Sequence, residues 1–593
     1  MRFALRLGFL WAALAAAPAS AAVSVVVSPG SVSLSANGAQ QFSAKVYGSS
    51  DLDVRWEVNG VPGGAPSIGV ISAAGLYTAP PDAPQTLSVT VEAEPAAAPA
   101  SPGTAQVSVA AGTKAGPSYY LSPTGKDSGS GAASEPWATF RHALATVPAG
   151  AQILVEGDTN HPYHELVKID RSGSATTGFI SIEAAPGAHP AIDGTGLGIP
   201  DYDDGLITIV NASWVRVEGL ELRNYVTSNA LLDPMGIFVQ GSGEHIEIID
   251  NYIHGIGTTV EKTGNAHGID IIGNVAPASL NWISVIGNTL ENLKLGNSET
   301  LTLEGNVQYW QVTDNSIHNN DNIGIDIAGF YKLVTDPAYD QARRGLVANN
   351  VVHDISGHGN PAYGYDYGAD GLYVDGGTLV TLQDNLVYRS DYGLEIASEN
   401  EGKAATWVWA HDNIIHHSYR AGITIGGSVA TANGGASNCF ILNNTLYMDD
   451  TTLSTEGEFQ IQQHAVDNVF ANNVLYANTD GVMYNGVGTA RPAGTFDHNL
   501  YFSSGATPEA KFVWLGVSYP SLSAFQGGSG QDGHSQLANP DFVDAAGGNF
   551  AIPANSRAVA LGQIFSLSNN GLTDYAGRPR TFMGTIDAGA LQH

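Results

Sequence analysis

A short motif built on asparagine recurs along most of the chain and constrains the fold more than any other feature. Each copy has an asparagine, then two mostly apolar residues and, in most copies, His or Tyr. The copies begin at Asn251, Asn288, Asn315, Asn350, Asn385, Asn413, Asn444 and Asn473. Their numbers differ by 27 to 37, which suits one coil of a parallel β-helix with loops of varying length, whereas propeller blades would keep a steadier period near 40.

Composition agrees with an all-β chain. Glycine is abundant at 71 of 593 residues, only 13% of residues are charged, and long helix-forming runs are missing after the N-terminus. Such a chain is too long for one ordinary compact core, and its turn-rich composition favours an elongated repeat.

The first part of the chain divides into three expected segments. Residues 1–21 have two arginines, an apolar stretch and Ala19-Ser20-Ala21, which together predict a secretory signal peptide and hence a secreted protein. Residues 22–112 alternate like short strands between Pro and Gly turns, which predicts a β-sandwich. Residues 113–118 are the predicted linker, and 119–593 form the repeat region.

Two resemblances support this division. The stretch "IGVISAAGLYTAP" (68–80) resembles the closing part of bacterial immunoglobulin-like modules. The stretches "YYLSPTGKDS", "GAQILVEG" and "NPDFVDAAGGNFAI" resemble the first and last coils of the pectate-lyase-like group of right-handed parallel β-helix proteins. The resemblance implies an all-β right-handed parallel β-helix preceded by an immunoglobulin-like β-sandwich. This scaffold carries lyases, hydrolases, epimerases and adhesins, so it leaves the reaction open.

Equivalent residues of successive coils should lie about 4.8 Å apart. The repeated asparagines are therefore expected to form an internal ladder. His254, His318, His353 and His416 alternate with tyrosines in one column, which favours ring stacking over metal binding.

A stripe of acidic residues is expected on one outer face. Aligning "GIDI", "GLYVDGG" and "GLEIASE" puts the aliphatic residues inside and the intervening residues toward solvent. The first outward column then reads Phe238, Asp270, Thr302, Asp326, Tyr373, Glu395, Thr424 and Gln460. The second reads Gln240, Ile272, Glu304, Ala328, Asp375, Ala397, Gly426 and Gln462. Acids gather in the middle coils without interleaved Lys or Arg, which predicts a functional cluster rather than a plain surface.

Carboxylate-based glycoside hydrolysis is our first interpretation of this stripe. The reaction needs one carboxylic acid and one carboxylate, about 5 Å apart for retention or roughly 6.5–9.5 Å for inversion. Adjacent and alternate coils supply these spacings. The expected catalytic residues are Asp326, Asp375, Glu395, Glu304 and Glu299. The expected substrate-binding residues are Asp370, Tyr365, Tyr373, Glu399 and Gln460, with a long loop, 331–370, overhanging the stripe.

A calcium-dependent polysaccharide lyase is the second interpretation. "HNNDNIGIDIAG" (318–329) resembles the calcium-binding turn of family 9 polysaccharide lyases, which implies Asp321 and Asp326 as possible Ca²⁺ ligands. Asn322 stands where that family has an acid, and Glu395 stands where its catalytic lysine is expected. This departure favours hydrolysis, for which no cofactor is required.

The charge of −32 limits the partners. Such a field repels nucleic acid and anionic membranes. No segment after the predicted signal peptide reaches about 20 apolar residues, so no membrane anchor is expected. We expect a monomer that acts on a polysaccharide; a non-catalytic adhesin is the third interpretation.

Overall fold

The computed structural model describes residues 23–593 apart from short gaps. The gaps are 36–37, 48–53, 66, 72–74, 81, 84–85, 96–99, 111, 114–115, 175–176, 487–493, 506–509, 566, 572 and 582–583. The predicted signal peptide, 1–21, lies outside the described residues.

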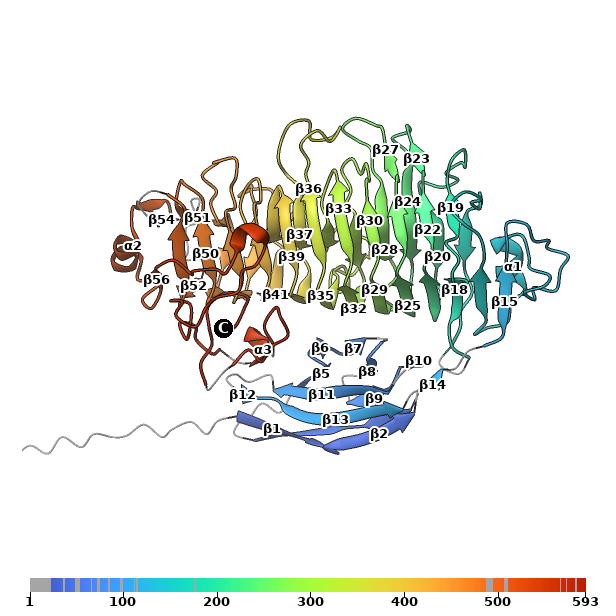
Figure 1. Ribbon diagram of the computed structural model, residues 1–593, viewed down its shortest axis with the longest axis horizontal. Coiled ribbons are helices and arrows are strands. Elements are labelled where there is room, and N and C mark those ends of the chain that lie inside the picture. Colours follow the sequence, from blue (N-terminus) through green and yellow to red (C-terminus); the bar gives the residue numbers. More distant parts are fainter. Residues whose placement is uncertain are drawn as a thin grey trace, which may run out of the picture.

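Three long sheets run side by side along a right-handed parallel β-helix (Figure 1), which confirms the predicted fold class. The first sheet, which carries the acidic stripe, consists of β17 (Val167–Ile169), β20 (Asp203–Val210), β24 (Asp233–Gln240), β28 (His267–Gly273), β31 (Leu301–Gly305), β34 (Ile325–Ile327), β37 (Asp370–Asp375), β40 (Tyr392–Ala397), β43 (Ile423–Ile425), β47 (Phe459–Ile461), β51 (Val482–Gly486), β54 (Lys511–Trp514) and β55 (Val517–Tyr519). Only the last pair, β54 with β55, is antiparallel among the pairings of this sheet in the described residues.

Each coil runs from the first sheet to the second and then to the third. The path of the second sheet is β15 (Ser118–Leu121), β16 (Gln152–Val155), β18 (Ile180–Ala184), β21 (Val215–Glu218), β25 (Gly243–Ile249), β29 (Leu280–Ile286), β32 (Val307–Thr313), β35 (Arg343–Ala348), β38 (Thr378–Gln383), β41 (Ala404–His411), β45 (Phe440–Leu442), β49 (Asn468–Ala471) and β52 (Gly494–Asp497). The third sheet is β19 (Ala191–Asp193), β22 (Glu221–Arg223), β26 (Tyr252–His254), β30 (Thr289–Glu291), β33 (Ser316–Asn320), β36 (Val351–Ile355), β39 (Leu386–Ser390), β42 (Ile414–His416), β46 (Thr445–Tyr447), β50 (Val474–Ala477), β53 (Leu500–Ser503) and β56 (Gln536–Leu537).

The asparagine ladder lies at the turn between the second and third sheets. Asn350 is typical: its side-chain amide donates to Val312 O at 2.9 Å and to Asn385 Oδ1 at 3.0 Å, and its own Oδ1 accepts the backbone N–H of Asn315 at 3.0 Å. The same pattern continues to Asn499, one coil beyond the repeat seen in the sequence. Every member before Asn499 therefore satisfies two buried backbone groups of the preceding coil and bonds to the asparagine side chain of the next.

The column of histidines and tyrosines stacks as predicted. On the outer face of the third sheet, the ring centroids of His318 and His353 are 4.7 Å apart, those of His353 and Tyr388 4.6 Å, and those of Tyr388 and His416 4.9 Å. The ring planes are within 9° of parallel in each pair.

The N-terminal module is a packed set of β-sheets with its own apolar core. Its main sheet contains β2 (Ser31–Ser35), β13 (Gly103–Ala110), β11 (Leu87–Pro95), β5 (Val54–Val58) and β6 (Val61–Pro62). The other strands are β1 (Val23–Ser28), β3 (Ala39–Gln41), β4 (Ser43–Tyr47), β7 (Gly64–Ala65), β8 (Gly69–Ile71), β9 (Leu76–Thr78), β10 (Asp82–Ala83), β12 (Ala100–Ser101) and β14 (Gly112–Thr113). Its immunoglobulin-like character and the boundaries 22–112 and 113–118 stay predictions.

This module packs along the second sheet of the solenoid (Figure 1). Val61 and Ala65 form an apolar cluster with Leu346 and Ala348 of β35. The guanidinium of Arg55 lies over the ring of Trp409, 5.0 Å from its centroid. The contact leaves the first sheet uncovered by the module.

α-Helices are few in the described part of the chain: two lie near the ends of the solenoid and one lies along the second sheet. α1 (Phe140–Thr146) packs near the first coils, with Thr139 as its N-cap. α2 (Leu522–Ser529) packs against β54, and α3 (Leu567–Asn570) lies in the C-terminal segment that returns along β41 and β45. Arg580 of this segment is fully buried and pairs with Asp412.

Candidate active site

The strand register confirms the first predicted outward column of the first sheet and parts of the second. Asp270, Thr302, Asp326, Tyr373, Glu395, Thr424 and Gln460 are successive partners in parallel pairing. In the second column Ile272 pairs with Glu304, and Asp375 with Ala397. The acids of five coils therefore do share one face.

A third outward column lies at the start of these strands, and simple alternation does not reveal it. Gly371 occupies an inward corner: a Cβ there would lie 2.4 Å from Val387 Cγ1. Glycine permits this close packing, and the preceding residue, Asp370, turns to the outer face. Asp370 pairs with Tyr392, and on an earlier coil His267 pairs with Met235 and lies beside Glu299.

The stripe is buried rather than exposed to solvent, which corrects the expectation from alternation. Asp326, Asp370 and Tyr373 are buried, and the exposed fraction of Asp375 is only 1%. Glu299, Glu304 and Glu395 are half-buried, and Glu399 is exposed. The side chains point away from the core as predicted, but neighbouring loops cover them.

Two loops provide the cover, where the sequence suggested one. β35 and β36 interrupt 331–370 and leave a first loop, 328–342, and a second loop, 356–369. Asp340 holds the first loop by accepting the N–H groups of Lys332 and Leu333 at 2.6 and 3.0 Å. The first loop lies between the first and second sheets, and the second between the third and first, so the stripe runs between them.

Asp391 holds the second loop. One of its oxygens, Oδ2, accepts the backbone N–H groups of Gly357, Gly368 and Ala369 at 2.7, 2.8 and 3.0 Å. The loop carries Tyr363, whose phenol lies close enough to Glu299, Glu399 and Asp370 for their charges to raise its pKa, after burial as the main cause.

Asp375 is a carboxylate with two hydrogen-bond donors. The Tyr331 hydroxyl donates to its Oδ2, and the Glu399 N–H donates to its Oδ1 at 2.6 Å. Burial raises the pKa of Asp375 to about 7, and these two donors oppose the increase. Since both donors stabilise the charged form, Asp375 is the acid of the stripe best suited to ionise.

Asp370 and Glu395 form a different pair. Their carboxyl groups are in direct hydrogen-bonding contact, which requires a proton between them. Burial raises the pKa of Glu395 to about 8, and burial together with the Glu395 charge holds the pKa of Asp370 well above its usual value. This pair therefore carries a proton at neutral pH.

Asp326 lies at the centre of the acids. Burial, followed by the charges of Glu299, Asp375 and Glu304, raises its pKa well above the usual value. Its Oδ1 is buried without a hydrogen-bond partner. The side chain can accept a proton or a polar substrate group at no cost in broken hydrogen bonds.

His267 is the residue of this face that sequence reasoning missed. Its ring nitrogens lie 3.6 Å from Asp233 Oδ2 and 3.8 Å from Glu299 Oε2. Although burial opposes its charged form, the charges of Asp233, Asp270 and Glu299 raise the pKa of His267 well above the usual value. The sequence did contain a signal for His267: His267-Gly268 in "HGID" occupies the same position at the start of its strand as Asp370-Gly371 in "DGLY".

Basic side chains are scarce at the stripe. In the described part of the chain, no Lys or Arg forms an ion pair with Glu299, Glu304, Asp326, Asp370, Asp375, Glu395 or Glu399; His267 beside Glu299 is the one basic group in such contact.

Three other expected site residues lie apart from this centre. The Tyr365 side chain is 82% exposed and contacts His358. Gln460 is buried and accepts hydrogen bonds from Thr424 and Gln462. Asp321 accepts the Leu295 N–H at 2.7 Å and lies 3.5 Å from Lys294 Nζ. Its position is therefore fixed by contacts that do not involve Asp326. Its role as a Ca²⁺ ligand stays a prediction.

Comparison with known proteins gives the family. No protein-family model matches the chain. The uncharacterized protein YwoF of Bacillus subtilis (strain 168) is 34% identical over 440 residues, which cover 74% of this chain and 91% of YwoF. The chain belongs to the YwoF family. Membership of the YwoF family does not disclose a reaction.

Solved structures of the same fold are more distant. The GH136 lacto-N-biosidase from Eubacterium ramulus is 14% identical, with a TM-score of 0.45, over 63% of this chain and 66% of that one. Pectate lyase Pel9A is 13% identical, with a TM-score of 0.44, over 80% and 96%. A protein described as a glycoside hydrolase is 11% identical, with a TM-score of 0.41, over 65% and 96%. These neighbours include both hydrolases and lyases, and at this distance they carry no argument about the reaction.

The chain has few helices of any length. Among the residues that the structure describes, no helix is both long and apolar enough to cross a membrane.

Proposed function

We propose that this protein is a secreted glycoside hydrolase that cleaves a polysaccharide along the acidic stripe. The observation that carries the proposal is the contrast between two carboxyl environments on one face: Asp375 with two donors, and Glu395 sharing a proton with Asp370. Hydrolysis of a glycosidic bond needs one protonated and one ionised carboxyl group, so this contrast supplies both.

The surroundings of each carboxyl group indicate its role in the proposed reaction. Glu395 is half-buried and, with its proton shared with Asp370, acts as the general acid toward the leaving oxygen. Asp375 acts as the carboxylate that attacks the sugar or activates water, because Tyr331 and the Glu399 N–H stabilise its charge. Asp326 binds substrate on the coil before Asp375, and Glu299 and Glu304 extend the stripe toward His267.

Substrate digestion tests the proposal. The full-length protein is incubated with a panel of neutral and uronic-acid polysaccharides, with and without a chelator, and products are analysed for new reducing ends and for absorbance near 235 nm. We expect reducing ends without unsaturated products, unchanged by the chelator. Unsaturated products formed only with Ca²⁺ would replace this proposal with a lyase, and binding without cleavage would indicate an adhesin.

A Ca²⁺-dependent lyase is the second candidate because the buried Oδ1 atoms of Asp270 and Asp326 have no hydrogen-bond partner. Such oxygens suit Ca²⁺ chemically. The geometry suits it less: in the described residues, no three ligand atoms of the stripe come within 4.8 Å of one another. Elimination also needs a base, and no lysine or arginine contacts these acids in the described chain.

A further inference from the structure

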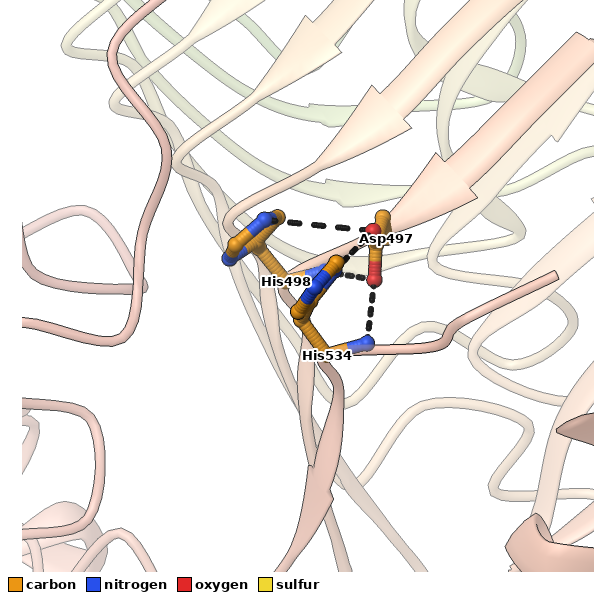
Figure 2. A group of neighbouring side chains, drawn as sticks. All are labelled: Asp497, His498 and His534. Atoms are coloured by element: carbon orange, nitrogen blue, oxygen red, sulfur yellow. Dashed lines mark hydrogen bonds and ion pairs between the residues drawn. The ribbon is translucent and has the colours of Figure 1, made fainter. Parts of the chain in front are cut away.

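A second cluster of chemically active side chains lies far from the stripe, at the last coils of the solenoid. Asp497 ends β52, His498 follows it, and His534 lies between α2 and β56 (Figure 2). One ligand atom from each of the three lies within 4.8 Å of the others. Two imidazoles and a carboxylate are the donor set that Zn²⁺ and related divalent transition metals prefer.

The backbone orients Asp497 toward both rings. Its Oδ1 accepts the N–H groups of His498 and His534 at 2.9 and 2.7 Å. Its Oδ2 is thereby directed to the side chains, lying 2.7 Å from His534 Nδ1 and 3.8 Å from His498 Nε2. Figure 2 shows the two rings side by side next to this carboxylate, and their centroids are 4.7 Å apart.

The hydrogen bonding of His498 leaves its inward nitrogen free to act as a ligand. Its Nδ1 lies 2.8 Å from the carbonyl oxygen of Leu561, which can only accept, so Nδ1 carries the hydrogen. In the neutral ring Nε2 then presents a lone pair toward Asp497 Oδ2. Two lone pairs facing each other at 3.8 Å attract a cation between them. A ligating histidine that donates its other N–H to a backbone carbonyl is the usual outer arrangement of a metal site.

We propose that Asp497, His498 and His534 bind one divalent transition-metal ion of the Zn²⁺ class, which clamps the C-terminal end of the solenoid. Tetrahedral ligands at about 2.1 Å from zinc lie about 3.4 Å apart. The distances of 2.7 Å (His534) and 3.8 Å (His498) from Asp497 Oδ2 lie on either side of this value, so shifts of both rings by less than about 1 Å complete the site. The His534 side chain is 70% exposed, which gives the ion an entry path and leaves a position for water.

Binding would join three segments distant in sequence. The ligands connect the turn after β52 to the segment after α2, and the Leu561 carbonyl connects His498 to the returning C-terminal segment. A bound ion therefore stabilises the folded state over the unfolded chain, in which these residues are apart. The site is independent of the proposed hydrolase activity.

Zinc titration of the tag-free full-length protein tests the site. We expect one Zn²⁺ per chain with micromolar or tighter affinity by isothermal titration calorimetry. His534→Ala should fold normally because the side chain is exposed, and should weaken binding on the order of 100-fold. The matched control is His161→Ala: His161 is also exposed and pairs with a carboxylate, Asp158, at 3.0 Å, but has no second histidine. The control should bind zinc like the wild type.

Thermal unfolding gives a readout independent of activity. Zn²⁺ should raise the Tm of the wild type and of His161→Ala, and should leave the Tm of His534→Ala unchanged. Zinc binding that survives both His498→Ala and His534→Ala, or the absence of binding at 100 micromolar Zn²⁺, would overturn the proposal and leave an ordinary ion pair between His534 and Asp497.

Discussion

Carboxyl groups on this face differ in what their oxygens contact, and that difference is the basis of the proposed chemistry. Asp375 receives hydrogen bonds from the Tyr331 hydroxyl and the Glu399 N–H, whereas Glu395 contacts another carboxyl group. The contacts of Asp375 favour its ionised form, whereas the contact of Glu395 with another carboxyl group favours its protonated form. The proposed roles therefore depend on neighbours that differ within one strand spacing.

Replacing the central acids should abolish turnover while the fold survives. We expect Asp326→Asn, Asp375→Asn and Glu395→Gln each to lower kcat by about 10²–10⁴-fold, the usual contribution of acid–base catalysis. Circular dichroism should remain unchanged because outward-facing residues contribute little to the core of a solenoid. Asp314→Asn, an exposed aspartate at the far turn, is the matched control. Ordinary activity in all three variants would refute the site.

Tyr331 offers a sharper test of the Asp375 assignment. Tyr331→Phe removes a donor that stabilises the charged carboxylate, so the pKa of Asp375 should rise. Because the base must be ionised, the acidic limb of the kcat/KM profile should move to higher pH, by about one unit. Tyr365→Phe, an exposed tyrosine of the neighbouring loop, should leave the profile unchanged. A shift of the alkaline limb instead would reverse the two roles.

At the scale of elements, the coils depend on the asparagine ladder as much as on apolar packing. Each member bonds to the coil on either side, so the ladder continues unbroken from Asn251 to Asn499. The loops that cover the stripe are held in a comparable way by single buried aspartates, Asp340 and Asp391. Few side chains thus position large parts of the site.

Truncating a central ladder residue should destabilise the solenoid strongly. Asn350→Ala leaves the N–H of Asn315 and the carbonyl of Val312 buried without partners, which should lower the free energy of unfolding by about 2–4 kcal/mol. Urea denaturation measures the change. Asn297→Ala removes an exposed hydrogen bond to the Lys262 carbonyl and should cost less than about 1 kcal/mol. Equal effects of the two variants would contradict a structural ladder.

At the scale of the whole molecule, buried acids make stability depend on pH. Folding raises the pKa of Asp270 and Asp375 from 3.8 to about 7, and of Glu395 from 4.5 to about 8. The folded state then binds more protons than the unfolded chain at neutral pH, so stability falls as pH rises. Buried His245 and half-buried His416, with pKa lowered to about 4, act in the opposite sense, but only below about pH 6.5.

We therefore expect the free energy of unfolding to decrease between pH 6.5 and 8, by up to about 1.4 kcal/mol per pH unit for each titrating group. Chemical denaturation at several pH values in this window, at constant ionic strength, measures the slope. Asp375→Asn cannot ionise and should flatten it, whereas Asp314→Asn should not. A stability that rises through this window would mean that a cation neutralises the stripe.

Much of the fold and of the candidate site could be predicted from the sequence because, in a solenoid, equivalent residues of successive repeats lie next to each other. The alternation around Asp326 predicts the first outward column, and the spacing of the asparagines predicts the ladder; both were confirmed. Burial of the stripe could not be predicted, since it depends on how loops of irregular sequence fold over a regular face. The corner at Gly371, which turns Asp370 outward, breaks the alternation on which the prediction depended.

The fixed spacing of strands in the solenoid limits the distances at which acids of different coils can be placed. Acids on neighbouring coils can move apart or together only in steps of about 4.8 Å, because whole coils are the unit that can be gained or lost without disturbing the interior. Insertion of one coil between Asp375 and Glu395 would increase their separation by one step while preserving their orientation. Variation in coil number would thus switch discretely between distances suited to different stereochemical outcomes.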